Sequence, residues 1–350
     1  MGAEKLLQAH HIRTFASTVL MRIGMGSDDA AVVADALAWA DLRGISAQGL
    51  SKLPVIVARV RAGGTAARPP VRIVSETAAV TVYDAASEWG QVSGARAMRA
   101  AVRKAAGTGV AMSIVRNAGS LGALGYYAML AAEQGQIGLA VNNSSPLLQA
   151  WGGTKPILGN QGFAVGAPSG GPVPLLLDTA LSSITLTRIH ELLAARARLP
   201  DGVAVNSDGR PTTDPREALA GGLLPSGGHR GFGLAIMFEV LTGVLSGGAC
   251  FADSARPLSE LNEPQGVSQF FLAIDPRVVM PLAEFTSRVD ALVEAIHRSP
   301  PAPGVDRVRV PGERAAALAV GREHDGVPFA ESELLKLQAL GTQYGVALGS

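Results

Sequence analysis

The feature that most constrains the fold is a change of hydrophobic period between residues 62 and 71. Residues 4–40 and 55–62 carry apolar side chains at helical spacing, and this pattern ends at Gly63-Gly64 and Pro69-Pro70. From Val71 the sequence VRIVSETAAVTVYDA alternates with a period of two, which is typical of half-buried strands. A chain of 350 residues also exceeds the size at which one core is comfortable, so we expect two domains.

Short apolar runs and helical patterns then alternate along the chain. Helices are expected over Gly90–Thr108, Tyr126–Gln134 and Leu282–His297. Strands are expected over Val110–Val115, Ile137–Val141, Leu175–Asp178 and Phe270–Ile274. Several of these strands end at polar residues, which is where sites usually lie. Pro311-Gly312-Glu313 opens a last helical segment.

Composition excludes several classes of function. The 30 Lys and Arg residues nearly balance the 29 Asp and Glu residues, so no overall field would gather nucleic acid or an anionic membrane. Small-molecule chemistry or protein contact is favoured instead. Cys250 is the one cysteine, which excludes an internal disulfide framework and suits a reducing cytoplasm. The first residues, MGAEKLLQAHHIRTFASTVL, lack the apolar core of a signal peptide, so a cytoplasmic location is expected.

The most apolar tract runs from Phe232 to Phe251 and is close to the length of a membrane span. Glu239 interrupts it and glycines crowd its end. We therefore expect a buried core helix and no membrane association.

The stretch from Ala40 to Pro54, ADLRGISAQGLSKLP, resembles an active-site corner. Gly44 follows an apolar-periodic helix where a left-handed cap is expected. Ser46, Gln48 and Lys52 then present three polar side chains within about two helical turns.

Two glycine-rich stretches are candidate phosphate sites. Residues 119–125 read G-x-x-G-x-x-G between a strand and a helix, but they fail the Rossmann spacing and no acidic residue follows at the right distance, which favours a plain tight loop. Gly227-Gly228-His229-Arg230-Gly231 at a helix start joins glycines and a cation with aligned amides. It suits an anion site or a simple turn equally well.

Patterns for nucleophilic and metal chemistry are weak. Ala118 stands where the first glycine of a G-x-S-x-G elbow around Ser120 would be. His190-Glu191 lacks the second histidine of H-E-x-x-H, so no metal site is indicated. His229 is the one histidine in a glycine-rich context.

Several stretches, taken in order, resemble one known family. They are ADLRGISAQGLSKLP, GALGYYAMLAAEQGQIGLAVNNSSP, AWGGTKPILGN, LLLDTA, DGRPTTDP, GGHRGFGLAIMFEVLTGVLSG, AIDP and PGE. The chain is thereby similar to the malate/L-lactate dehydrogenase family of the L-sulfolactate dehydrogenase type, whose members include ureidoglycolate dehydrogenase, diketogulonate reductase and piperideine-2-carboxylate reductase. The resemblance covers nearly the whole chain.

The resemblance implies an α/β (α+β) fold with a non-Rossmann, NAD(P)-binding mixed sheet. It implies a helical domain built from residues 1–70 and 281–350, and a mixed-sheet domain over residues 71–280. Alternating charges over residues 186–222 indicate a small helical subdomain within the latter. A homodimer with sites near the interface is implied as well.

The polar corner departs from the family pattern D-S-H-G-x-x-R-L-P. Gln48 stands at the proton-donating histidine and Lys52 at the arginine that holds the substrate carboxylate. The second family histidine falls on Ser120, and G-T-N-P has become Gly159-Asn160-Gln161-Gly162. Gln48, Lys52 and Ser120 are therefore the candidate catalytic residues.

The cofactor side keeps more of the family pattern. The resemblance places NADH or NADPH against Ser144, Asp178, Thr179, Ala180, His229, Arg230, Pro311, Gly312 and Glu313.

Loss of the histidine changes which chemistry is feasible. Reduction of a ketone needs a proton at oxygen, and a positioned acid contributes ~10² to 10⁴ in rate. Glutamine cannot supply this proton, whereas an iminium binds already protonated. The sequence therefore suggests NAD(P)H-dependent reduction of a C=N or activated C=O substrate, with Lys52 anchoring an anionic group and Gln48 orienting the acceptor. The alternative is a relative that has lost dehydrogenase activity and performs a non-redox reaction or only binds a ligand. A plain interaction protein is the third possibility.

Overall fold

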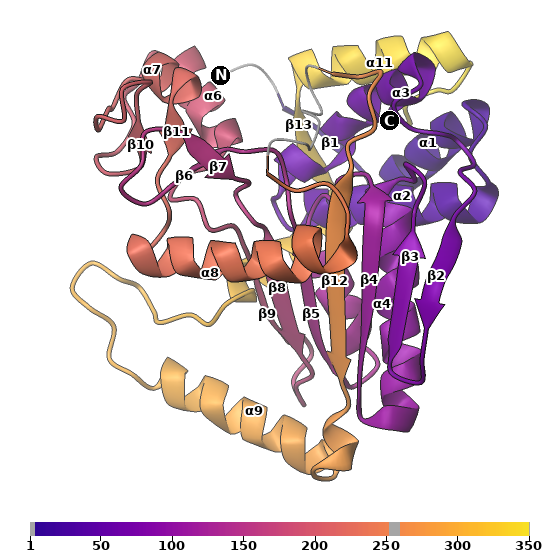
Figure 1. Ribbon diagram of the computed structural model, residues 1–350, viewed down its shortest axis with the longest axis vertical. Coiled ribbons are helices and arrows are strands. Elements are labelled where there is room, and N and C mark those ends of the chain that lie inside the picture. The colour runs from indigo at the N-terminus through magenta and orange to yellow at the C-terminus, as the bar shows by residue number, and fades with distance from the viewer. Residues whose placement is uncertain (1–3, 252–259, 350) are drawn as a thin grey trace.

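The computed structural model of the protein describes residues 4–251 and 260–349, and a seven-stranded sheet lies at its centre (Figure 1). In spatial order the strands are β2 (Arg72–Glu76), β3 (Val80–Asp84), β4 (Val110–Ala118), β12 (Val267–Ile274), β5 (Ile137–Asn142), β8 (Phe163–Ala167) and β9 (Leu175–Thr179). Only β3 and β4 run parallel, and the other neighbours are antiparallel. A Rossmann sheet is mostly parallel, so the expected non-Rossmann mixed sheet is confirmed.

Helices cover both faces of the sheet. Helices α4 (Gly90–Thr108) and α5 (Gly125–Ala132) pack on one face. Helix α8 (His229–Glu239) crosses the other face, in front of the sheet in Figure 1, where α4 lies behind it. Neighbouring side chains of β12 show the division, because Phe271 joins the α4/α5 core and Phe270 joins the α8 core. Successive strand residues point to opposite faces, and strands covered on both sides are continuously apolar, as the sequence FFLAI is.

A helical layer at one end of the sheet draws on both ends of the chain (Figure 1). It contains α1 (Ala9–Arg22), α2 (Ser27–Leu42), α3 (Leu53–Ala62) and α11 (Glu331–Tyr344). One buried core joins them, with Phe15, Leu37 and Leu53 packing in the same cluster as Leu337. Trp89, at the start of α4, belongs to this core and so connects the layer to the sheet.

The helical pattern expected from residue 4 is wrong for the first four described residues. They form β1 (Glu4–Leu7), which pairs antiparallel with β13 (Val327–Ala330). The partner strand lies near the opposite end of the chain, and a local pattern cannot indicate such a pairing.

Residues 186–222 contain α6 (Leu186–Ala194) and α7 (Pro215–Ala220), which flank a small four-stranded sheet (Figure 1). Its strands are β10 (Ala204–Val205), β11 (Gly222–Leu223), β6 (Leu148–Gln149) and β7 (Pro156–Leu158). A separate core around Ile189 and Leu199 holds this unit together.

The expected burial of the apolar tract from Phe232 is wrong. Ala235 and Phe238 of α8 are buried against the sheet, whereas Met237 is 56% exposed and Val244 is 53% exposed. The helix covers the sheet with one face, and no described part of this chain covers the other. Among the described residues, no helix has the length and hydropathy needed to cross a membrane.

The remaining C-terminal helices begin where the sequence places them. Helix α9 (Leu282–His297) has no buried residue and is tied to the loop after β8 by hydrogen bonds of 3.1 Å from the Gly170 N–H to both carboxyl oxygens of Asp290. Helix α10 (Glu313–Asp325) starts directly after Gly312.

Candidate active site

The corner between α2 and α3 consists of two short 3-10 turns, Ser46–Gln48 and Leu50–Lys52. Helix α2 ends at Leu42, and Gly44 has φ 77°, so the expected left-handed turn is present. The backbone N–H of Leu50 donates a 2.7 Å hydrogen bond to Oδ2 of Asp41. This bond ties the turns that carry Gln48 and Lys52 to the preceding helix.

The loop after β4 forms the second wall of the site. Gly119 and Ser120 press against the start of α4 so closely that a Cβ on Gly90 would lie 2.1 Å from the Ser120 carbonyl oxygen. The Tyr127 hydroxyl donates a 2.6 Å bond to the Leu121 carbonyl from the other side. The position of Ser120 is therefore fixed by packing against α4 and by a hydrogen bond to the residue that follows it.

A segment that precedes β12 forms the third wall, and Arg59 of α3 holds it. The buried Arg59 guanidinium donates to the carbonyl oxygens of Glu260, at 3.1 Å, and Glu263. Gln265 follows, and its Oε1 accepts a 3.2 Å hydrogen bond from the Ser120 N–H. Arg59 thus fixes the backbone that brings Gln265 to Ser120.

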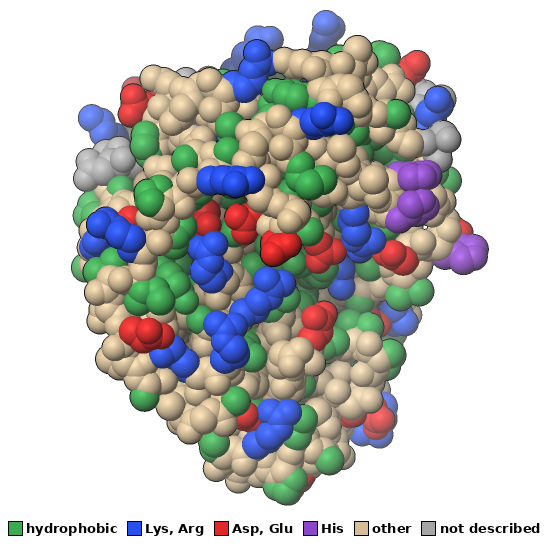
Figure 2. All heavy atoms as spheres, turned by 90° about the vertical axis from the view of Figure 1, so that its right-hand side faces the viewer, with side chains coloured by type: hydrophobic (Ala, Val, Ile, Leu, Met, Phe, Trp, Pro, Cys, Tyr) green, Lys and Arg blue, Asp and Glu red, His purple; other side chains and the backbone are tan. Residues whose placement is uncertain are grey.

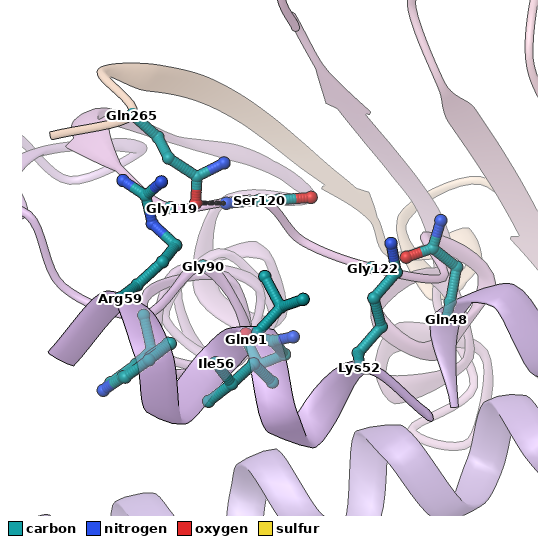
Figure 3. Close-up of a pocket in the computed structure, with 12 residues that line it drawn as sticks. Gln48, Lys52, Ile56, Arg59, Gly90, Gln91, Gly119, Ser120, Gly122 and Gln265 are labelled. Carbon is teal, nitrogen blue, oxygen red and sulfur yellow. Dashed lines mark hydrogen bonds between the residues drawn. The ribbon is translucent and has the colours of Figure 1, made fainter. Parts of the chain in front are cut away.

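These three walls enclose a pocket of about 130 Å³. Figure 3 shows Gln48 and Lys52 on one side of it and Arg59, Ser120 and Gln265 on the other. The polar side chains that line it are Gln48, Lys52, Arg59, Gln91, Ser120 and Gln265. The structure therefore brings the three candidate catalytic residues into one pocket. Their roles stay predictions.

Sequence reasoning missed Arg59, Gln91 and Gln265. Arg59 follows Lys52 by two helical turns on α3 and could have been found from that spacing. Gln265 comes from the other half of the chain, and no local signal indicates it.

The pocket is cationic and contains no acid among its described lining residues. Burial lowers the pKa of Lys52, and its side-chain ammonium forms no hydrogen bond or ion pair with any residue that the structure describes. Burial also lowers the pKa of Arg59, but a guanidinium stays charged in proteins. Such a pocket favours an anionic ligand, because a partner charge would offset the desolvation of Lys52.

A second cluster contains many of the residues assigned to the cofactor, and a chain of hydrogen bonds connects their segments. The Ser144 hydroxyl donates to Oδ1 of Asn160 at 3.1 Å, and the Leu181 N–H donates to the Asn160 carbonyl at 2.8 Å. The Ser226 N–H donates in turn to the Leu181 carbonyl at 2.7 Å. Ser144, the segment after β9 and the turn before α8 are therefore adjacent.

The turn before α8 has the shape of an anion site. Gly227 and Gly228 both adopt positive φ, at 72° and 63°, and no side chain within residues 4–251 or 260–349 caps the N-terminus of the helix. His229 and Arg230 are exposed in the first turn. The Trp151 ring lies against Gly228 and is 55% exposed, an aromatic surface that sequence reasoning did not assign.

Strand β9 carries Asp178 and Thr179, and Ala180 follows directly. Oδ2 of Asp178 accepts a 2.8 Å hydrogen bond from the Gly125 N–H at the start of α5. Burial raises the pKa of Asp178 to about 6, and the bond from Gly125 opposes this rise. Gly312 packs on the same strand, since a Cβ there would lie 2.6 Å from the Leu176 carbonyl oxygen.

Glu313 is engaged within its own turn. Its carboxyl group pairs with His297 at 2.9 Å and with Arg307 at 2.7 Å, and it accepts a 3.1 Å bond from the Val310 N–H. Its described contacts tie the Pro311-Gly312 turn to the end of α9 and the loop that follows, and none of them reaches the Ser144 cluster.

The surface agrees with the balanced composition. On the face drawn in Figure 2, Lys and Arg side chains lie among Asp and Glu side chains, so no extended single-sign patch covers this face.

The mixed sheet with its helical layer has counterparts among known proteins. A family model described as malate/L-lactate dehydrogenase matches residues 7–338. Malate dehydrogenase of Pyrococcus horikoshii is 35% identical over 341 residues, which cover 95% of this chain and 94% of that protein.

Two solved structures are similar over nearly their whole lengths. The sulfolactate dehydrogenase from Methanocaldococcus jannaschii gives a TM-score of 0.92 at 32% identity and covers 98% of both chains. The delta1-piperideine-2-carboxylate reductase from Pseudomonas syringae pvar. tomato gives a TM-score of 0.87 at 27% identity, covering 96% of this chain and 99% of that one.

The fold and the matches define an NAD(P)-dependent oxidoreductase, as expected from the sequence. The chain belongs to the malate/L-lactate dehydrogenase family.

Proposed function

We propose that this enzyme uses NADH or NADPH to reduce a C=N bond, or an activated C=O bond, in a small substrate that bears a carboxylate. One observation carries the proposal: the pocket combines the cation of Lys52 with the amides of Gln48, Gln91 and Gln265 and has no carboxylate or histidine among its described lining residues. Its polar groups suit a carboxylate-bearing substrate whose C=N nitrogen is already protonated when the substrate binds. The similarity to a piperideine-2-carboxylate reductase supports an imine substrate.

Lys52 and Gln48 take separate roles in this proposal. Lys52 anchors the substrate carboxylate, because it is the cation of the pocket that no described residue pairs. Oε1 of Gln48 points towards Gly122, since a Cβ built on Gly122 would lie 4.0 Å from it. This oxygen can accept a hydrogen bond from an iminium N–H. When hydride adds to the iminium carbon, the π electrons move to nitrogen and the neutral amine forms without a further proton.

The dinucleotide supplies this hydride when bound. The turn before α8 fits its phosphates, because none of the described side chains caps the helix, two positive-φ glycines precede it and Arg230 is exposed beside them. Ser144, Asp178, Thr179 and Ala180 lie on the segments next to this turn and would hold the rest of the molecule. The Gly312 turn supports β9 from outside.

Reduction of a C=O bond is the second candidate, and the environment of Lys52 favours it. Among the described lining residues, Lys52 carries a side-chain proton that burial makes easier to release, because burial lowers the pKa of its ammonium group. Lys52 would then protonate the developing alkoxide instead of anchoring the carboxylate.

Binding and turnover separate these candidates from a relative without redox activity. Titration of the purified protein with NADH and with NADPH, followed by nucleotide fluorescence, should show saturable binding of at least one. Failure of both to bind would remove the oxidoreductase proposal. Consumption of the bound nucleotide with a cyclic imino acid but not with pyruvate would favour imine reduction over ketone reduction.

We also propose that the enzyme acts as a homodimer. The outer face of α8 and its continuation exposes Leu234, Met237 and Val244, and apolar surface of this kind is usually covered by a partner. Light scattering after size exclusion should give twice the 35.9 kDa mass of the chain, and Met237→Glu should lower it. A monomer at micromolar concentration would contradict the proposal.

A further inference from the structure

Asp41 lies beneath the corner that carries the two proposed substrate-binding side chains. It occupies the last turn of α2 and is 1% exposed. Its Oδ2 accepts the 2.7 Å hydrogen bond from the Leu50 N–H. Gly49 covers its other oxygen so closely that a Cβ on Gly49 would lie 1.8 Å from Oδ1. Gln48 precedes this contact directly, and Lys52 follows Leu50 by two positions.

Among the described hydrogen bonds that residues 46–52 donate, the bond from Leu50 to Asp41 is the one that reaches the preceding helix. The other hydrogen bonds described as donated by residues 46–52 end within the corner itself, at the carbonyl oxygens of Ile45, Ser46 and Gly49. Without the bond to Asp41, no described donor of these turns would bond to α2, and the turns could shift relative to that helix.

We propose that Asp41 is a positioning residue of this active site, which holds Gln48 and Lys52 in the pocket through the Leu50 amide, and that protonation of its carboxylate loosens that hold. The inference rests on the proposed function only for the activity measured below. A carboxylate accepts a backbone hydrogen bond about twice as strongly as a neutral carboxyl group does.

The surroundings of Asp41 allow its charge to change near neutral pH. Burial raises its pKa to about 7, and the bond from Leu50 opposes this rise. Two charged groups on packed helices act on it: Glu333 of α11 raises the pKa, and Arg322 of α10 lowers it. The Arg322 guanidinium also donates to the Asp41 backbone carbonyl, so it stays beside the end of α2.

The first experiment compares kcat/KM of the wild-type enzyme with that of Asp41→Asn from pH 5.5 to 9, with a cyclic imino acid and the preferred nucleotide. Asparagine keeps an oxygen acceptor for Leu50 and cannot ionise. Taking the ratio of the two enzymes at each pH cancels the titration of the substrate. We expect the ratio to rise about fivefold through pH 7 as Asp41 ionises. A ratio that is flat with pH would overturn the proposal.

Glu333→Gln is the matched control. It removes the neighbouring charge that raises the pKa of Asp41, so the midpoint of the ratio should move to lower pH while its amplitude is kept. An unchanged midpoint would show that the transition belongs to another group. If Asp41→Asn proves unstable, the ratio of wild type to Glu333→Gln serves instead: it should dip near pH 7, because the two enzymes differ in the pKa of Asp41, and a flat ratio would contradict the proposal.

A second readout does not depend on turnover. Lys52 can be labelled with acetic anhydride over the same pH range and its labelling measured by peptide mass spectrometry. The labelling ratio of wild type to Asp41→Asn should change through pH 7, because the corner carries Lys52. A change in labelling without turnover of any imine would refute the proposed function and keep this inference. A constant ratio would refute the inference whatever the enzyme reduces.

Discussion

The Leu50 backbone N–H and the Asp41 carboxyl group are joined by a buried hydrogen bond of 2.7 Å, and Gly49 lies directly against the same carboxyl. The φ of Gly49 is −89°, so its backbone does not need a glycine. The need is for space, because any Cβ would overlap Oδ1 of Asp41. Polar burial and close packing therefore act together to shape the corner that carries Gln48 and Lys52.

Gly49→Ala should strongly destabilise the protein. Its Cβ would have to displace a buried carboxyl group, and overpacking of this kind costs about 3 kcal/mol. Gly321→Ala in α10 is the matched control, because a Cβ there meets nothing within 4 Å and should gain about 1 kcal/mol of helix propensity. Urea denaturation measures both. Equal stability of the two variants would contradict the close contact at Gly49.

Asp41 should make stability fall as pH rises. Its pKa is raised from 3.8 to about 7 in the folded state, so its contribution is fully present below pH 3.8 and is lost as pH rises through 7. At about 1.4 kcal/mol for each pKa unit, the whole change amounts to roughly 4 kcal/mol.

Asp41→Asn should remove this dependence, so the unfolding free energy of wild type minus that of the variant should decrease between pH 4 and 8. A pH-independent difference would contradict the buried titration. The ionised carboxylate of Asp41 is thus the form that holds the corner best, and it is also the form that lowers the free energy of unfolding. Active sites commonly show this trade-off between activity and stability.

Lys52→Met should raise stability and lower activity. The variant removes a buried cation that no described residue pairs, so unfolding should require more denaturant. Loss of a charged hydrogen bond to the substrate should cost about 10- to 100-fold in kcat/KM, mainly through KM if Lys52 anchors a carboxylate. A fall confined to kcat would instead support Lys52 as the proton donor. Lys52→Arg, which keeps the charge, should retain the larger part of the substrate affinity.

Arg230→Gln should weaken binding of the dinucleotide about tenfold, because a charge-assisted bond to phosphate is lost at the start of α8. The affinity should also depend less on salt concentration. Arg288→Gln on α9, an exposed arginine away from this turn, is the control and should bind as wild type does. Fluorescence titration gives both affinities, and equal values would exclude the α8 turn as the phosphate site.

Elements with strong local signals could be predicted from the sequence. Helices α4 and α9 have the expected boundaries, because Gly109 ends the first with a positive φ and a proline precedes the second. Strand β12 is longer than its FFLAI core, since polar Ser268 and Gln269 are buried in the ladder as well. A prediction from hydrophobic periodicity alone leaves such polar residues out of the strand.

Other features depend on contacts between distant segments. The pairing of β1 with β13 and the contact of Gln265 with Ser120 join segments that no local pattern relates. The exposure of α8 could not be predicted either, because an apolar run is the same whether this chain or a partner covers it. For the site, the sequence indicated Gln48, Lys52 and Ser120. The burial that lowers the pKa of Lys52 could be seen only in the folded structure.

The central claim is that this pocket serves a substrate that needs no proton from the enzyme. The most direct test measures NADH and NADPH consumption with a cyclic imino acid, with pyruvate and with oxaloacetate, for the wild type and for Gln48→His. The account predicts turnover of the imine by the wild type, little turnover of either keto acid, and recovery of keto-acid reduction in Gln48→His. Equal turnover of the imine and the keto acids by the wild type would contradict it.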